Sequence, residues 1–193
     1  MGNLRTEFYS YTGQRITRDE GCLTLLDIAV GLGRVCRYGG GSTQFWPVLL
    51  HSFIVADLVP PELEAYGLLH DMTDVLFSDI PKPFKTVETL ALQHRIHNRQ
   101  LLNFGLPLLG EDDEERVQVA DTRAFIGEKG ILAPAAMVKA LPGRDQEAED
   151  LTRYYFQSYP IEALVNADGQ PVQVFIARAR RTIKEAQLGR PSR

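Results

Sequence analysis

Apolar side chains recur along most of the chain at intervals of three and four residues, the spacing of amphipathic helices. In the first half this pattern predicts a helix over residues 23–35, which ends before three consecutive glycines. A second helix is predicted over residues 47–58, and a third opens at Pro61 and continues through Leu76. The prolines of segment 80–83 end the third helix, because each disfavours helix in the residue before it.

The second half of the chain follows the same pattern. It predicts a long polar helix over residues 86–102, a helix around 117–125 after an acidic stretch, and further helices at 146–158 and 172–186. Residues 1–19 alternate weakly around a Thr-Gly pair, which predicts an extended arm or a small hairpin. The sequence therefore predicts an all-α fold with a short extended arm at its N-terminus.

Length and charge restrict the class of protein only partly. A chain of 193 residues is expected to form one domain over residues 1–193, with enough buried apolar surface to fold by itself. A net charge of −4 with interspersed signs argues against the broad basic face that duplex nucleic acid requires. A small phosphorylated ligand stays compatible, because a few local cations can neutralise it.

Nothing in the sequence indicates export or membrane insertion. The two cysteines, Cys22 and Cys36, are too few for a disulfide framework and lack metal-site spacing, so we expect reduced thiols. The first 21 residues are polar, and no apolar run approaches the roughly 20 residues that span a bilayer. We therefore expect a cytoplasmic protein without a membrane partner.

Candidate chemistry begins at the adjacent pair His70 and Asp71, near the end of a mostly apolar helix. Burying an imidazole and a carboxylate without partners is costly, and a divalent cation would compensate both. Taken alone, the pair is more typical of ordinary hydrogen bonds at a helix end than of a metal site. His51 and Asp121 are each embedded in an apolar helical pattern, and they add a second imidazole and a second carboxylate from two other helices. Two imidazoles and two carboxylates would leave open positions on an octahedral ion for water and substrate.

The order His, His-Asp, Asp resembles the signature of the HD superfamily of metal-dependent phosphohydrolases. The wider resemblance covers roughly residues 9–130 and is closest to the HD-domain 5′-deoxynucleotidases and their bacteriophage relatives, which include dATP triphosphohydrolases. It is carried by Asp-Ile-Ala at 27–29, Cys-Arg-Tyr-Gly-Gly at 36–40, His-Ser at 51–52, Leu-Leu-His-Asp at 68–71, Ser-Asp-Ile-Pro-Lys-Pro-Phe-Lys at 78–85 and Ala-Asp-Thr-Arg at 120–123.

The resemblance implies an HD-type helical bundle that holds one divalent transition metal, namely Mn²⁺, Co²⁺, Zn²⁺ or Fe²⁺. Its ligands would be His51, His70, Asp71 and Asp121, and a further Mg²⁺ or Mn²⁺ would accompany the substrate phosphates. Asp74, three residues after Asp71 and so on the same helix face, is the candidate to orient or deprotonate the attacking water. The alternative is that Asp74 is a surface carboxylate one turn along the helix.

The same resemblance assigns substrate-binding roles to five residues. Lys85 would contact phosphate with help from Lys82, and the alternative for both is a solvated loop lysine. Asp79 would accept a hydrogen bond from the sugar 3′-hydroxyl and so favour deoxyribose. Arg37 and Tyr38 would line the nucleotide pocket, the arginine reaching phosphate or base and the ring packing against the nucleoside.

The sequence departs from the pattern of these relatives at several positions. Asp74 stands where glutamate is usual, Leu50 replaces the Glu or Gln before the first histidine, and Gln118 stands where a lysine is common. The shorter Asp74 would alter proton abstraction, and Leu50 would remove a contact behind the metal ligand. Gln118 would remove a positive charge from the phosphate side. His94 and His97 look like surface residues of a polar helix rather than a second metal site.

The expected activity is hydrolysis of a 2′-deoxynucleotide, with a dATP-like dNTP triphosphohydrolase preferred over a deoxynucleoside 5′-monophosphatase. Two rivals stay open: a catalytically silent nucleotide-sensing protein, and an HD phosphodiesterase for an alarmone or a cyclic dinucleotide. By the resemblance the protein would form a homo-oligomer. The sequence leaves the base preference and the native metal undetermined.

Overall fold

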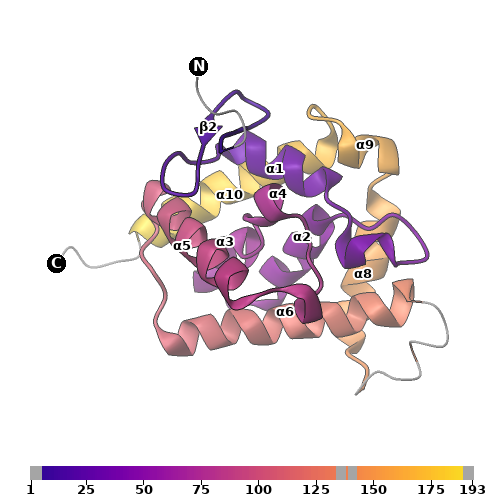
Figure 1. The fold of residues 1–193 in the computed structure, drawn as a ribbon. Helices are drawn as coiled ribbons and strands as arrows, with labels where there is room; N and C mark the ends of the chain where they lie inside the picture. The colour runs from indigo at the N-terminus through magenta and orange to yellow at the C-terminus, as the bar shows by residue number, and fades with distance from the viewer. Residues whose placement is uncertain (1–5, 134–137, 139–142, 189–193) are drawn as a thin grey trace.

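The computed structural model describes residues 6–133, 138 and 143–188 of the chain, and these residues are predominantly helical. Figure 1 shows helix α6 running along one side of the bundle, with α5, α3 and α2 gathered above it and the N-terminal hairpin at the opposite side. The all-α fold predicted from the sequence is confirmed. No helix in this described part is long and apolar enough to cross a bilayer.

The predicted N-terminal hairpin is present and is fastened to the first helix. Strand β1 (Phe8–Tyr9) pairs antiparallel with β2 (Arg15–Ile16). Helix α1 (Leu25–Arg34) begins with a capping box between Thr24 and Asp27. The Asp27 carboxylate also accepts hydrogen bonds from the backbone N–H of Thr12 at 2.7 Å and from its hydroxyl at 2.9 Å. One buried carboxylate therefore both caps α1 and holds the turn of the hairpin.

Helix α2 (Val48–Leu58) forms the centre of the bundle. Every residue from Val48 to Ala56 is buried, as expected for a helix that is apolar on all faces. Helices α1, α3 (Glu64–Leu69), α6 (Glu111–Leu132), α8 (Gln146–Ser158) and α10 (Gln170–Leu188) pack around it. A polar side chain within the stretch from Val48 to Ala56 is therefore enclosed by protein.

The third predicted helix is not continuous. A 3₁₀ turn, η2 (Pro61–Leu63), leads into α3, which ends at Leu69, and a separate short helix, α4 (Asp74–Phe77), follows after the turn formed by residues 70–73. The apolar spacing persists across the break because Met72 is fully buried inside the turn. The His-Asp pair consequently lies in a turn rather than within a helix.

The other elements agree with the predicted pattern, apart from two short turns, the start of one helix and one additional helix. Two 3₁₀ turns, η1 (Arg37–Gly40) and η3 (Lys82–Phe84), occupy predicted loops, and α5 (Val87–Asn103) begins at the Thr86 cap. The acidic stretch before the predicted helix at 117–125 is itself the first turn of α6, where carboxylates favour the positive end of the helix dipole. A short helix, α9 (Ile161–Val165), was not predicted.

Candidate metal centre

Three of the four predicted ligands, His51, His70 and Asp121, come from separate elements and form one cluster, and Asp71 lies beside two of them. His51 lies on α2 and is fully buried, His70 and Asp71 lie in the turn after α3, and Asp121 lies on α6. His51 Nε2 is 3.1 Å from His70 Nε2 and 3.0 Å from Asp121 Oδ1. Asp71 Oδ2 is 3.1 Å from His70 Nε2 and 3.6 Å from His51 Nε2.

These separations suit a single metal ion. Ligand atoms bonded at about 2.1 Å to one ion, at right angles to each other, lie about 3 Å apart. The candidate ligand atoms of His51, His70 and Asp121 all lie within 4.8 Å of one another, with His70 Nε2 and Asp121 Oδ1 separated by 3.9 Å. This cluster could therefore hold a metal ion, and mixed imidazole and carboxylate donors suit several divalent transition metals.

Both histidines are oriented by hydrogen bonds at their other nitrogen. His70 Nδ1 donates to the backbone carbonyl of Gly67 at 2.8 Å, and His51 Nδ1 lies 2.7 Å from Glu128 Oε1. Each bond leaves Nε2 facing the cluster, which is how metal-binding histidines are usually held. Leu50, which stands where the resemblance led us to expect a polar group, is an ordinary core residue at 1% exposure. Glu128 supplies the contact behind the ligand instead.

Sequence reasoning missed Glu128, although a signal was present. It lies seven residues after Asp121 on α6, which is two turns along the same helix face. It is fully buried, and its carboxylate also accepts a hydrogen bond from the Tyr38 hydroxyl and lies 3.2 Å from Arg37 Nε. Burial opposes its ionisation, but His51 and Arg37 lower the pKa of Glu128 to about 2.

Electrostatic coupling among the candidate ligands favours the protonated form of His51. Burial and the Arg37 charge lower the pKa of His51, but Glu128 and Asp121 outweigh them and raise it to about 9. Burial raises the pKa of Asp71, yet His70, His51 and Arg37 hold it well below its usual range. The metal-free cluster therefore carries a positive imidazole between negative carboxylates, which is the charge pattern that a metal ion would take over.

Asp74 is the first residue of α4 and is buried, with 3% of its surface exposed. Its expected alternative, a surface carboxylate, is wrong. Burial and the neighbouring Asp71 raise the pKa of Asp74 to about 8, and Lys85 acts against them by lowering it. A carboxyl group with a pKa near neutrality beside a metal cluster has the property expected of a general acid or base.

Arg37 and Tyr38 lie beside the cluster in η1. The Arg37 side chain is buried, and its Nη1 lies 3.2 Å from Asp71 Oδ2 in addition to its contact with Glu128. Tyr38 adopts a left-handed backbone conformation with a φ of 60°, and its N–H donates to Asp79 Oδ2 at 2.6 Å. Arg37 therefore braces two carboxylates of the site, and Asp79 holds the backbone of η1.

The two expected phosphate lysines have different positions. Lys85 is half-buried and close enough to Asp74 to lower the pKa of that carboxyl group. Lys82 is exposed in η3, and among the described residues no hydrogen bond or ion pair links its side chain to the ligands. The structure thus brings Lys85, but not Lys82, into electrostatic contact with the centre.

A hollow of about 190 Å³ opens beside His70, between α3, α5 and α6. His94 and His97 of α5 line it together with Gln118 of α6. The expectation that His97 is a surface residue is wrong, because it is mostly enclosed, and burial and then His70 lower its pKa to about 4. Neither histidine joins a second metal cluster among the residues that the structure describes.

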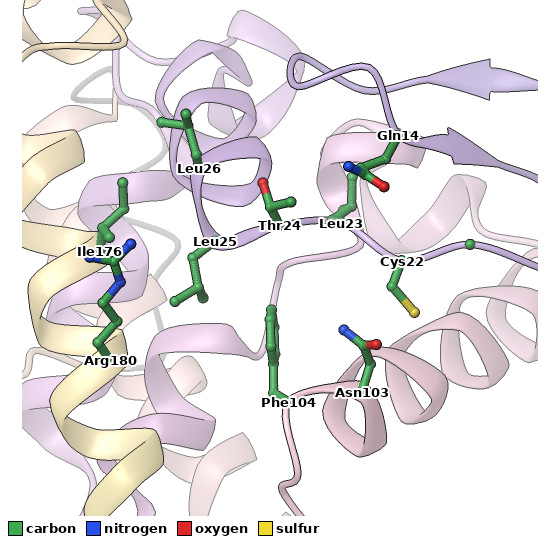
Figure 2. Close-up of a pocket in the computed structure, with 11 residues that line it drawn as sticks. Gln14, Cys22, Leu23, Thr24, Leu25, Leu26, Asn103, Phe104, Ile176 and Arg180 are labelled. Atoms are coloured by element: carbon green, nitrogen blue, oxygen red, sulfur yellow. The ribbon is translucent and has the colours of Figure 1, made fainter.

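A larger hollow of about 660 Å³ lies away from the ligands. Figure 2 shows it between the segment before α1, the end of α5 and one face of α10, with Cys22, Phe104 and Arg180 around it. None of the residues around it is a candidate ligand or a predicted substrate contact. The volume of a hollow alone therefore does not identify the candidate functional site.

Comparison with known proteins adds little beyond these observations. No protein-family model matches the chain. The uncharacterized protein YfdR of Escherichia coli (strain K12) is 37% identical to it over 95 residues, which cover 48% of this chain and 52% of YfdR. The chain thus spans about half the length of the relative it matches. The name of that relative states no activity, so the function has to be argued from the site.

Proposed function

We propose that this protein is a metal-dependent phosphohydrolase of the HD type that acts on 2′-deoxynucleotides. The observation that supports the proposal most is the cluster of His51, His70 and Asp121, with Asp71 close to both histidines. A buried carboxyl group with a raised pKa, Asp74, lies beside that cluster. Together they provide the two components of hydrolysis, an electrophilic centre and a proton acceptor.

A divalent ion bound there would polarise a phosphoryl oxygen and acidify a water molecule. The protein's own groups would do the rest. Asp74 would take the proton from the attacking water, since the positive charge of a loaded site would lower its pKa and keep it ionised. Lys85, which already acts on Asp74, would lie near the phosphate and offset its charge. Arg37 would keep Asp71 and Glu128 in place.

The choice of substrate rests on the sequence resemblance. A dATP-like triphosphohydrolase is our first candidate and a deoxynucleoside 5′-monophosphatase the second, in either case acting in the cytoplasm as a homo-oligomer. Asp79 has one oxygen engaged with the backbone of Tyr38, which leaves its second oxygen for a sugar hydroxyl. The metal would be Mn²⁺, Co²⁺, Zn²⁺ or Fe²⁺.

The test is a nucleotide panel. Purified protein loaded with Mn²⁺ or Co²⁺ is incubated with each dNTP, dNMP and matching ribonucleotide, and the products are separated by chromatography. Release of triphosphate identifies the first candidate and release of phosphate identifies the second. Asp121→Asn, which removes a ligand charge, is the matched inactive control. Absence of turnover for every nucleotide with both metals would defeat the proposal.

One observation favours a second candidate, a nucleotide sensor without efficient chemistry. Asp74 has a shorter side chain than the glutamate of the resembling enzymes, and it is already enclosed by protein. A sensor predicts that the metal-loaded protein binds nucleotide without hydrolysing it, and that Asp71→Ala abolishes metal binding. Isothermal titration calorimetry alongside the panel separates the two functions.

A further inference from the structure

Lys129 is an additional cation at the edge of the candidate centre. It follows Glu128 on α6, and its Nζ lies 3.7 Å from the centroid of the Tyr38 ring and 5.7 Å from that of Phe125. A lysine ammonium over an aromatic face at this distance is a cation–π contact. The ring of Tyr38 is fixed in turn by the bond from its hydroxyl to Glu128. The ammonium is therefore held over a ring that is itself bonded to Glu128, the partner of the candidate ligand His51.

The Lys129 ammonium has no carboxylate of its own. None of the ion pairs formed by the described residues includes it, and its side chain is mostly buried. Burial and then the Arg37 charge lower the pKa of Lys129, while Glu128 and Asp79 act in the opposite direction. An ammonium group has three donors, and a ring face engages only its charge. Hydrogen-bonding capacity is thus left over at this position.

The other cations near the site are more fully engaged or lie elsewhere. Arg37 is shared between Asp71 and Glu128, so its charge is already compensated within the protein. Gln118, which stands where a lysine is common in the resembling enzymes, brings no charge. Among the described residues around the site, Lys85 and Lys129 form no ion pair, so their charge is left for an anionic ligand.

We infer that Lys129 binds a phosphate oxygen of the substrate, and that the Tyr38 ring is the platform that holds its ammonium group in place. The inference rests on the proposed function. It changes the role expected of Tyr38, because the ring already contacts Lys129, Arg37 and Phe125 within the protein.

Binding measurements can isolate the phosphate contact from catalysis. The probe is the 5′-methylenephosphonate analogue of deoxyadenosine monophosphate, which cannot be hydrolysed at the 5′ position, and deoxyadenosine is the uncharged reference. Titration calorimetry on the Mn²⁺-loaded protein gives the ratio of the two affinities. We expect Lys129→Gln to lower this ratio by about tenfold or more, the loss typical of a charged hydrogen bond. Lys129→Arg should stay within about threefold of the native ratio, because it keeps the charge.

The control is Lys184→Gln, which removes an exposed lysine from α10 and should leave the ratio unchanged. A native ratio in Lys129→Gln overturns the inference, and so does a native protein that does not distinguish the analogue from deoxyadenosine. If the ratio depends on Lys129 but no nucleotide is hydrolysed, the inference stands and the proposed enzymatic function fails. If nucleotides are hydrolysed but the ratio is the same in Lys129→Gln, the proposed enzymatic function stands and the inference about Lys129 fails.

Discussion

A histidine binds a metal through a lone pair on one nitrogen, and the partner of its other nitrogen decides which nitrogen that is. For His51 the partner is Glu128, which comes from a different helix and is itself tied to Arg37 and Tyr38. A change at Glu128 should therefore reach the metal although the residue does not bind it. Substitutions at Glu128 and at Asp74 can separate this orienting role from the chemical role proposed for Asp74.

Glu128→Gln should weaken metal binding by about tenfold to a hundredfold, the usual effect of removing a partner behind a metal ligand. The amide still accepts a hydrogen bond from His51 Nδ1 but carries no charge, so the fold should persist. Calorimetric titration with Mn²⁺ measures the affinity, and Glu162→Gln, an exposed change on α9, is the control. An unchanged affinity for Glu128→Gln would show that His51 is oriented without it.

Asp74→Asn should lower kcat by about 10² to 10⁴, the typical contribution of a general base, while leaving metal affinity nearly intact. The amide matches the shape of the carboxyl group and cannot accept the proton. Asp74→Glu should keep activity, because it restores the side chain found in the resembling enzymes. Steady-state kinetics on the best substrate of the panel decide the matter. Equal kcat values for the native protein and Asp74→Asn would remove Asp74 from the mechanism.

Sequence reasoning reached the residues whose chemistry is unusual for their surroundings. His51 and Asp121 stood out because each interrupts an apolar helical pattern, and the structure brings both to the cluster. Glu128 and Lys129 did not stand out, because charged residues near the end of a polar helix normally face water. Their burial depends on how α6 packs against α2 and η1, which no local pattern reveals.

At the scale of elements, the contact between α6 and α8 depends on a glycine. A Cβ atom at Gly127 would lie 2.5 Å from the backbone carbon of Ala148 and 2.7 Å from the backbone nitrogen of Glu149. Backbone atoms cannot turn aside as a side chain can, so the helices would have to separate. Gly127 precedes Glu128, and the spacing of these helices therefore bears on the metal site.

Gly127→Ala should destabilise the protein by about 1–3 kcal/mol, because overpacking against backbone exceeds the gain in helix propensity. Gly143→Ala is the matched control, since a Cβ at Gly143 meets no atom within 4 Å. Thermal unfolding should show a drop of several degrees for Gly127→Ala and little change for Gly143→Ala. Equal melting temperatures for the two variants would mean that the helices adjust freely.

Helical periodicity predicted most of the elements but not their interruptions. The spacing of apolar residues continues from α3 into α4, because the turn at 70–73 buries Met72 as a helix would. The break is instead set by the tertiary positions of His70 and Asp71, whose side chains both reach the cluster from this turn. Helix α9 spans only five residues, too short for a periodic signal.

At the scale of the whole molecule, the fold concentrates charge around a single buried point. The chain carries only four net negative charges, yet three carboxylates with lowered pKa values meet at the cluster. Protonated His51 and the Arg37 guanidinium hold them together without a metal. Metal binding should therefore be linked to proton release.

Because the metal-free pKa of His51 is about 9, the imidazole must lose a proton before it can bind a metal at neutral pH. We expect Co²⁺ affinity to rise by at least about tenfold per pH unit around neutral pH. One proton should leave His51 for each ion bound, and a second should leave Asp74, whose pKa of about 8 the bound ion would lower. Calorimetry in buffers of different ionisation enthalpy measures the release. An affinity that does not change with pH would contradict the raised pKa.

The effect of rising pH on the stability of the fold without metal has the opposite sign to its effect on metal affinity. A histidine whose folded pKa lies above its unfolded value stabilises the fold while it is protonated, and this contribution is lost as pH rises through about 9. Alkaline conditions should thus favour the loaded protein and weaken the unloaded one. Metal added at high pH should raise the melting temperature more than metal added at neutral pH, as differential scanning fluorimetry can show.

Helix α4 has only four residues and cannot be stable on its own. Its position comes from its neighbour α1, where a Cβ at Gly31 would come within 2.6 Å of the Val75 side chain. His51 and Asp121 lie on the long helices α2 and α6, but the proposed proton acceptor Asp74 is carried by this short helix. Small displacements of α1 would therefore move Asp74 more than these two candidate ligands, so that the rate of the proposed reaction can change more than the metal affinity in descendants of this chain.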